Sequence, residues 1–133
     1  MTQRNRPQNY PAIAPYIFAN DALGLIRFIT SGLGAREIGR SHMPDGTIAN
    51  CQLRIDDAVI MVTEARGTYR ATRGAYYLYV DDVDKVMKRA IEAGAILNFE
   101  AMDMPYGDRQ GGVKDPEGNL WWISKRLSDE PYF

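Results

Sequence analysis

Histidine and cysteine, two of the side chains most used in acid–base and metal chemistry, each occur once in this sequence of 133 residues, and the paired aspartates have simple structural explanations. His42 is the only histidine, and it stands beside the predicted turn 43–46, where a histidine is ordinarily solvated. The carboxylate pair Asp56-Asp57 is typical of a hairpin turn, and the pair Asp81-Asp82 is typical of a helix N-cap. The aromatic residues are therefore the better candidates for a functional surface.

Aromatic residues recur at matching places in the two halves of the chain. Tyr16 corresponds to Tyr77, and the turn Met43-Pro44-Asp45-Gly46 recurs in the same register as Met104-Pro105-Tyr106-Gly107 (104 − 43 = 61). Asp21 and Asp82 share this register, and Gly34-Ala35 matches Gly94-Ala95 after a slip of one residue. Several matches in one register indicate an internal repeat.

Each half carries the signals of one helix among four strands. In the first half, Asp21 is a suitable N-cap, apolar residues then recur at helical spacing, and Gly34 ends the predicted helix. The predicted strands of this half are 13–19, 35–41, 47–55 and 58–63, the last two forming a hairpin. The second half repeats the order, with a strand over 75–80, a helix capped by Asp81 or Asp82, and three more strands.

The repeat predicts an α+β fold of two βαβββ modules in tandem. We expect a curved mixed sheet that encloses a cleft, with both helices on its outer face, because helices this short bury little surface alone. The predicted organisation is a flexible arm over 1–10, a single domain over 11–127 and a C-terminal tail over 128–133. Within the domain, module one spans about 11–66 and module two about 72–127.

Composition excludes several classes of partner. The formal net charge of −1 favours neither nucleic acid nor an anionic membrane. No apolar run approaches the roughly 20 residues of a transmembrane helix, and residues 1–10 do not resemble a signal peptide. Cys51 is the only cysteine, so a disulfide within the chain is impossible and a reducing, cytoplasmic location is expected.

Three segments of the chain resemble the vicinal oxygen chelate superfamily, which comprises glyoxalases, bleomycin-resistance proteins and extradiol dioxygenases. They are Tyr16-Ile-Phe-Ala-Asn-Asp-Ala22, the turn 43–46 and the run from Tyr106 to Trp122. The resemblance covers nearly all of 11–126 and is nearest to the PhnB-like branch. Because the superfamily holds metal-dependent enzymes as well as metal-free proteins that sequester antibiotics, the resemblance does not choose among functions.

The resemblance implies where metal ligands would stand. In the metalloenzymes, His or Glu side chains on the first and last strand of each half converge on the cleft. The corresponding positions here are Ala14, Met61, Ala75 and Trp122, and none offers a nitrogen or oxygen ligand. A lone Met sulfur does not hold Zn²⁺, Mg²⁺ or Fe²⁺, so we expect no metal and no other cofactor. Glu64 is one residue out of step with the cleft side.

Strand alternation extends these four positions to a predicted cleft lining. The lining is expected to be aromatic, with amides and hydroxyls and almost no titratable group, and Cys51 is expected on the opposite, buried face. The candidate ligand-binding residues are Tyr16, Phe18, Asn50, Gln52, Met61, Thr63, Tyr77, Tyr79, Tyr106, Arg109, Trp122 and Ser124. Val59, Arg54, Leu120, Gly111 and Val113 are expected on the same side.

Individual lining residues also have structural explanations. Tyr and Trp on a concave sheet can be plain core or dimer interface, and one of Trp121 and Trp122 must face the core because neighbours in a strand alternate. Arg109 is as well explained by an ion pair with Asp108 or Asp115 as by an anionic ligand group.

Three functions are compatible with this cleft. The leading prediction is a metal-independent protein that binds a flat organic molecule by stacking, as a homodimer whose arm 1–10 could reach the partner. The second is a superfamily enzyme, such as a lyase, dioxygenase or isomerase, with a shifted or absent metal site. The third is a structural dimerisation module whose aromatic face is covered by its own mate.

Overall fold

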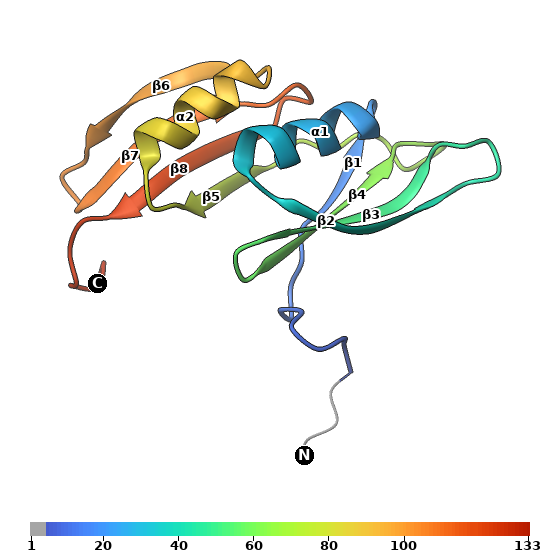
Figure 1. Ribbon diagram of the computed structural model, residues 1–133, viewed down its shortest axis with the longest axis horizontal. Helices are drawn as coiled ribbons and strands as arrows, with labels where there is room; N and C mark the ends of the chain where they lie inside the picture. Colours follow the sequence, from blue (N-terminus) through green and yellow to red (C-terminus); the bar gives the residue numbers. More distant parts are fainter. Residues whose placement is uncertain (1–4) are drawn as a thin grey trace.

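The computed structural model describes residues 5–133, which fold into two successive βαβββ modules (Figure 1). Module one comprises β1 (Tyr16–Ala19), α1 (Ala22–Leu33), β2 (Arg36–His42), β3 (Ile48–Ile55) and β4 (Ala58–Glu64). Module two comprises β5 (Ala75–Tyr79), α2 (Val83–Glu92), β6 (Ile96–Asp103), β7 (Asp108–Lys114) and β8 (Leu120–Arg126). The predicted α+β class and tandem repeat are confirmed. Residues 1–4 of the predicted arm lie outside the described residues.

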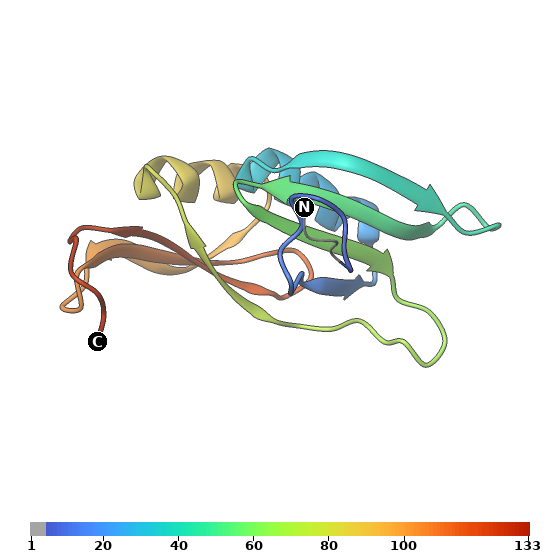
Figure 2. The same cartoon turned by 90° about the horizontal axis from the view of Figure 1, so that it is seen from below.

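Each module forms a mixed sheet of its own. The strand orders are β1-β4-β3-β2 and β5-β8-β7-β6, and the two orders correspond strand for strand. The first strand of each module runs parallel to the last, whereas the other neighbours are antiparallel. The expected single sheet is therefore two four-stranded sheets, joined by the long connection 65–74 (Figure 2).

Both helices begin and end at residues that satisfy their free backbone groups. The Asp21 carboxylate accepts a hydrogen bond from the Gly24 N–H at 3.0 Å, and α1 ends at Gly34, whose φ of 82° is left-handed. In α2, Asp82 is the N-cap rather than Asp81, because its carboxylate accepts from the Lys85 N–H at 3.1 Å. The helices thus start where the acidic signals of the sequence predicted.

The helices lie side by side on the same side of the two sheets (Figure 1). Gly32 brings them together, since a Cβ at this position would lie 3.1 Å from the Cβ of Ala93. One continuous core of buried residues spans both modules, including Leu25 and Phe28 of α1 and Met87 of α2. Trp121 belongs to this core and packs against Tyr76, with ring centroids 4.8 Å apart. Of the two tryptophans, Trp121 is therefore the core residue.

The Glu117 carboxylate ties module two to the start of α1 in module one. Glu117, in the turn between β7 and β8, accepts hydrogen bonds from the backbone N–H groups of Asn20 at 2.8 Å and Asp21 at 3.0 Å. These groups lie at the start of α1, where the helix dipole favours a negative charge. The turn itself is shaped by Asp115 and Asn119, as expected from the sequence.

None of the helices in the described part of the chain has the length and apolar character needed to cross a membrane.

Candidate functional site

Strand pairing separates each sheet into a helix-covered face and an open face. In module one, Met61 lies directly between Tyr16 on β1 and Gln52 on β3, and Phe18 is paired with Thr63. The alternate residues, such as Ile17 and Val62, are buried beneath α1. The open face of module one therefore carries the residues that the sequence predicted for it.

Aromatic rings form a continuous strip on the open face of module one. The ring centroids of Tyr16 and Phe18 are 4.9 Å apart, and Phe18 stacks on Tyr69 at 5.8 Å with an interplanar angle of 18°. Tyr69 comes from the connection 65–74 and was not predicted, because a loop residue has no strand periodicity to place it. A flat ring system can stack on such a strip.

Amide groups stand beside the aromatic strip on β3. The Gln52 side chain donates to the side-chain Oδ1 of Asn50 at 3.0 Å and accepts a hydrogen bond from the Tyr10 hydroxyl. The Arg54 guanidinium lies 5.8 Å from the centroid of the Tyr10 ring. Asn50 and Gln52 also line a shallow hollow of about 230 Å³ that extends over Ile38–Ser41 of β2. Residue 10 of the predicted arm is thus held against its own sheet.

The open face of module two carries a second aromatic group. The ring centroids of Tyr77 and Tyr79 are 5.2 Å apart, and those of Trp122 and Phe99 of β6 are 5.8 Å apart. Phe99 was not predicted. Gly112 makes room for it, since a Cβ on Gly112 would lie 2.2 Å from the Phe99 ring. Sequence alone shows the two glycines of β7 but not which ring occupies their space.

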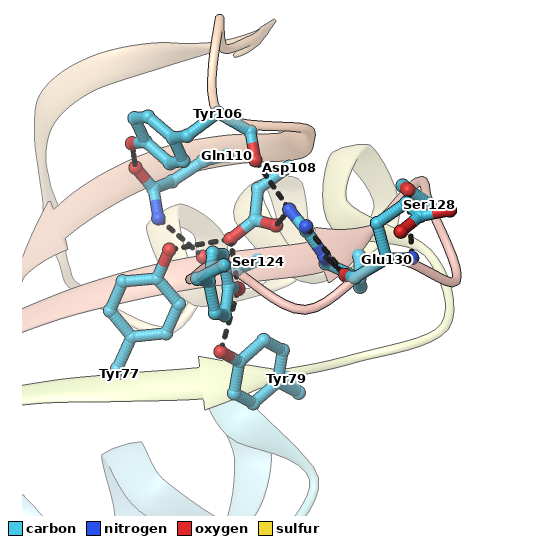
Figure 3. A network of polar contacts seen from close by, with 10 residues as sticks. Tyr77, Tyr79, Tyr106, Asp108, Gln110, Ser124, Ser128 and Glu130 are labelled. Atoms are coloured by element: carbon cyan, nitrogen blue, oxygen red, sulfur yellow. Dashed lines mark hydrogen bonds and ion pairs between the residues drawn. The ribbon is translucent and has the colours of Figure 1, made fainter.

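A buried carboxylate organises the polar part of this face (Figure 3). Asp108 is 0% exposed, and its Oδ2 accepts hydrogen bonds from the hydroxyls of Tyr77 and Tyr132, each at 2.6 Å. Its Oδ1 accepts from the Arg126 guanidinium at 3.0 Å. The Tyr79 hydroxyl lies 2.8 Å from the Tyr132 hydroxyl and extends the network to β5. The expectation of a lining almost free of titratable groups is wrong for module two.

The network keeps Asp108 ionised and its phenol partners protonated. Burial alone would raise the pKa of Asp108, but the hydrogen bonds from Tyr132, Tyr77 and Arg126 outweigh it and hold this pKa below the ordinary value. Burial and the bond to Asp108 raise the pKa of Tyr77, and the bonds to Asp108 and Tyr79 raise that of Tyr132. None of these groups is therefore placed to exchange a proton near neutral pH.

A second polar chain crosses the same face. Gln110 is buried on β7, donates to the Ser124 hydroxyl at 2.7 Å, and accepts a hydrogen bond from the Tyr106 hydroxyl. The predicted residues Tyr106 and Ser124 are thus brought together by a glutamine that the sequence did not single out. Ser124, like Thr63 in module one, is buried, so both hydroxyls lie beneath the surface that a ligand would meet.

Three residues predicted for the open face lie on the opposite face. Arg109 pairs with Asp84 of α2 at 2.9 Å and with Asp103 at 3.0 Å, instead of Asp108 or Asp115. Gly111 lies beneath α2, because a Cβ there would be 2.9 Å from the Met87 sulfur. Val113 is paired with the core residue Trp121. Gln110 and Gly112 occupy the open face instead, paired with Ser124 and Trp122.

The error has a local cause in the repeat. Ser41 pairs with Asn50 but His42 pairs with Ile48, so β3 contains one extra residue at a bulge, and β7 has no counterpart. The turn between β7 and β8 is then one residue longer than the repeat predicts, which restores the register on β8. Transferring the faces of β3 to β7 by the offset of the repeat therefore places the β7 residues on the wrong sides of the sheet. The same transfer from β4 to β8 is correct.

The positions that would hold a metal in related enzymes do not suit one. Met61 and Trp122 stand on the open faces and Ala75 begins β5, while Ala14 precedes β1, and none of the four carries a suitable donor. Within residues 5–133, no three His, Cys, Asp or Glu side chains gather closely enough to hold a metal ion. Cys51 is fully buried, and burial raises its pKa to about 11, so it is not placed as a thiolate nucleophile.

Comparison with known proteins bears on the identity of the fold. Residues 11–123 match the family model of the Glyoxalase/Bleomycin resistance protein/Dioxygenase superfamily. An uncharacterised protein of Mycobacterium bovis is 32% identical over 130 residues, which covers 90% of this chain and 86% of that protein. An uncharacterised protein of Mycobacterium tuberculosis is also 32% identical, with 90% of this chain and 76% of that protein covered.

Solved structures of similar fold include TioX and TnmS3. TioX from Micromonospora sp. ML1 superposes with a TM-score of 0.75 at 26% identity, covering 88% of this chain and 99% of that chain. TnmS3, an antibiotic binding protein from Streptomyces sp. CB03234, has a TM-score of 0.68 at 20% identity, with 88% and 99% coverage. At 20% identity the likeness to TnmS3 shows the fold alone.

Proposed function

Because the chain belongs to the glyoxalase/bleomycin resistance protein/dioxygenase superfamily, we propose that it binds a flat organic molecule without a metal ion. The observation that carries this proposal is the set of aromatic rings that the chain leaves uncovered. Tyr16, Tyr77 and Tyr79 are 50%, 46% and 52% exposed, although each has a neighbouring ring within 5.2 Å. Rings that are ordered but uncovered are suited to stacking on a ligand.

The side chains at the family's metal positions support metal independence. Ala14, Met61, Ala75 and Trp122 would need substitution before they could hold a hard or borderline cation. The enzyme alternative has less support, because Asp108 and its phenol partners titrate far from neutral pH. We therefore favour binding over catalysis at these faces.

The relatives suggest which ligands to try first. TnmS3 is an antibiotic binding protein, and TioX has the same fold at a higher identity to this chain. We infer that a large, flat natural product is a more suitable probe than a small metabolite. The PhnB-like assignment belongs to this proposal as well, and it rests on the resemblance of residues 16–22, 43–46 and 106–122.

A homodimer is the assembly we propose for this function in the cytoplasm. The two open faces together expose several large aromatic side chains, and a second copy could cover part of them while enclosing a ligand. Light scattering at micromolar concentration measures the mass directly. A dimer that binds no flat ligand in a broad screen would support the structural dimerisation alternative instead.

The decisive experiment measures metal content and ligand binding on the same preparation. After incubation with Zn²⁺, Ni²⁺, Mn²⁺ and Fe²⁺ and then desalting, we expect each metal far below one per chain. A thermal-shift screen of flat aromatic compounds should then yield a stabilising ligand. Trp122→Ala should weaken its binding at least ten-fold, whereas Ile91→Ala, on the exposed side of α2, should not. Stoichiometric metal, or equal loss in both variants, would contradict the proposal.

A further inference from the structure

We propose that the Asp108 network is a recognition site for the phenol group of a hydroxyaromatic ligand, and that Tyr132 occupies this site in the free chain. The inference rests on the proposed function and names the ligand class for module two. Its starting observation is that a phenol from the segment 127–133 already sits in the network. Tyr132 meets Asp108 and Tyr79 through its hydroxyl and Arg126 through its ring.

The site recognises both parts of a phenol. The hydroxyl donates to Asp108 Oδ2 at 2.6 Å and lies 2.8 Å from the Tyr79 hydroxyl. The ring is covered by the Arg126 guanidinium, whose carbon lies 4.1 Å from the ring centroid, within the range of a cation–π contact. Arg126 is itself fixed, since it donates to Asp108, to the Tyr106 carbonyl and to the Glu130 carbonyl.

The charges of the site favour a neutral donor over an ion. Asp108 is 0% exposed, and its ionised carboxylate can accept hydrogen bonds but cannot donate them. A ligand carboxylate would therefore be repelled by its charge. An ammonium group would be attracted by Asp108 but repelled by Arg126, which already pairs with that carboxylate at 3.0 Å. A phenol satisfies Asp108 without adding charge, as Tyr132 does. The chemistry therefore selects hydroxylated aromatic rings.

Tyr132 is placed to be exchanged for a ligand. It lies six residues beyond β8 in a segment without helix or strand, and its side chain remains 42% exposed although its hydroxyl is fully engaged. A ligand phenol would replace the contacts that Tyr132 gives up, so the exchange leaves Asp108 with its hydrogen bonds. The aromatic rings of Tyr77 and Tyr79 lie next to the site and could hold the remainder of the ligand.

Chemical complementation with p-cresol, the side chain of tyrosine as a free molecule, tests this site. We expect Tyr132→Ala to bind p-cresol saturably and at least ten-fold more tightly than the wild-type chain, with amide shift changes at Asp108 and Ser124 in NMR spectra. Toluene, which has the ring without the hydroxyl, should bind the variant at least ten-fold more weakly than p-cresol. Equal p-cresol affinity for variant and wild type, or equal binding of toluene, would overturn the proposal.

A second pair of variants separates the site from a folding effect. Adding Tyr79→Phe to Tyr132→Ala removes one hydroxyl that meets the phenol and should weaken p-cresol binding three-fold or more, whereas adding Ile91→Ala, on the exposed side of α2, should not. If Trp122→Ala weakens the binding of a flat ligand but Tyr132→Ala does not change the affinity for p-cresol, only this inference fails. If no aromatic probe binds either chain, the proposed function fails with it.

Discussion

At the scale of single residues, Asp108 combines complete burial with three hydrogen-bond donors from separate parts of the sequence. Tyr77 comes from β5, Arg126 from the end of β8 and Tyr132 from the segment beyond it. A buried carboxylate with fewer donors would cost several kcal/mol, on the order of the whole stability of a domain. The donors therefore have a structural role in addition to the binding role proposed for the site.

The Asp108 network predicts a dependence of stability on pH. Because the folded-state pKa lies below the ordinary value, the unfolded chain binds a proton first as the pH falls. The stabilisation is complete above the unfolded pKa of about 4 and is lost as the pH falls through the folded pKa. Asp108→Asn should lower the free energy of unfolding by about 3 kcal/mol at pH 7, since Arg126 loses its partner.

Urea denaturation at pH 7, 5 and 3 measures this difference. We expect the difference in the free energy of unfolding between wild type and Asp108→Asn to be equal at pH 7 and 5 and smaller at pH 3. Asp129→Asn, which changes an exposed carboxylate beyond β8, serves as the matched control and should change stability by less than about 0.5 kcal/mol. A difference that grows on acidification would show that the pKa of Asp108 is higher in the folded chain than in the unfolded chain.

Cys51 permits a second prediction at this scale. Burial raises the pKa of its thiol to about 11, and the side chain is fully covered in the core. At pH 8 we therefore expect no alkylation by iodoacetamide in the folded chain during a time that labels the urea-unfolded chain completely. Mass spectrometry counts the added groups. Labelling of the folded chain at the unfolded rate would place Cys51 at the surface.

At the scale of elements, the position of the Phe99 ring of β6 over β7 depends on Gly112. A Cβ at this position would lie 2.2 Å from the Phe99 ring, so Gly112→Ala should displace Phe99 and lower the free energy of unfolding by about 1–3 kcal/mol. Gly39 of β2 is a matched control, because a Cβ there meets no atom within 4 Å. Thermal unfolding of both variants makes the comparison. Because the loss of backbone entropy alone favours alanine in both strands, equal losses of stability would mean that the cost at Gly112 does not come from the Phe99 ring.

Element-level features divide into those the sequence could predict and those it could not. The cap at Asp21 and the hairpin at Asp56-Asp57 depend on neighbouring residues, so local patterns located them, and the second cap was narrowed to Asp81 or Asp82. The bulge in β3 depends on how β2 pairs with it, and no residue type marks it. For the same reason the partners of Asp108, up to 31 residues away, could not be inferred from spacing.

At the scale of the whole molecule, the two modules share one core beneath their helices while keeping separate sheets. Arg89 of α2 donates to the Ser31 carbonyl of α1 at 2.5 Å, so polar contacts as well as apolar ones join the helices. The open faces are left on the other side, where aromatic side chains stay exposed. This arrangement stabilises the modules against each other without using the surface proposed for binding.

Glu117 joins the turn between β7 and β8 to the start of α1, and its substitution tests the coupling of the two modules. Glu117→Gln keeps the size of the side chain but leaves one of the N–H groups of Asn20 and Asp21 without its acceptor. It also removes a negative charge from the start of α1, so we expect a loss of about 1 kcal/mol in the free energy of unfolding. Glu100→Gln, on an exposed position of β6, should have little effect.

Urea unfolding followed by two probes measures the coupling. Tryptophan fluorescence reports module two, and circular dichroism reports both modules. We expect coincident transitions in the wild-type chain and in both variants, because the shared core remains. Separate transitions in Glu117→Gln would show that this contact, rather than the helix interface, makes the modules unfold together.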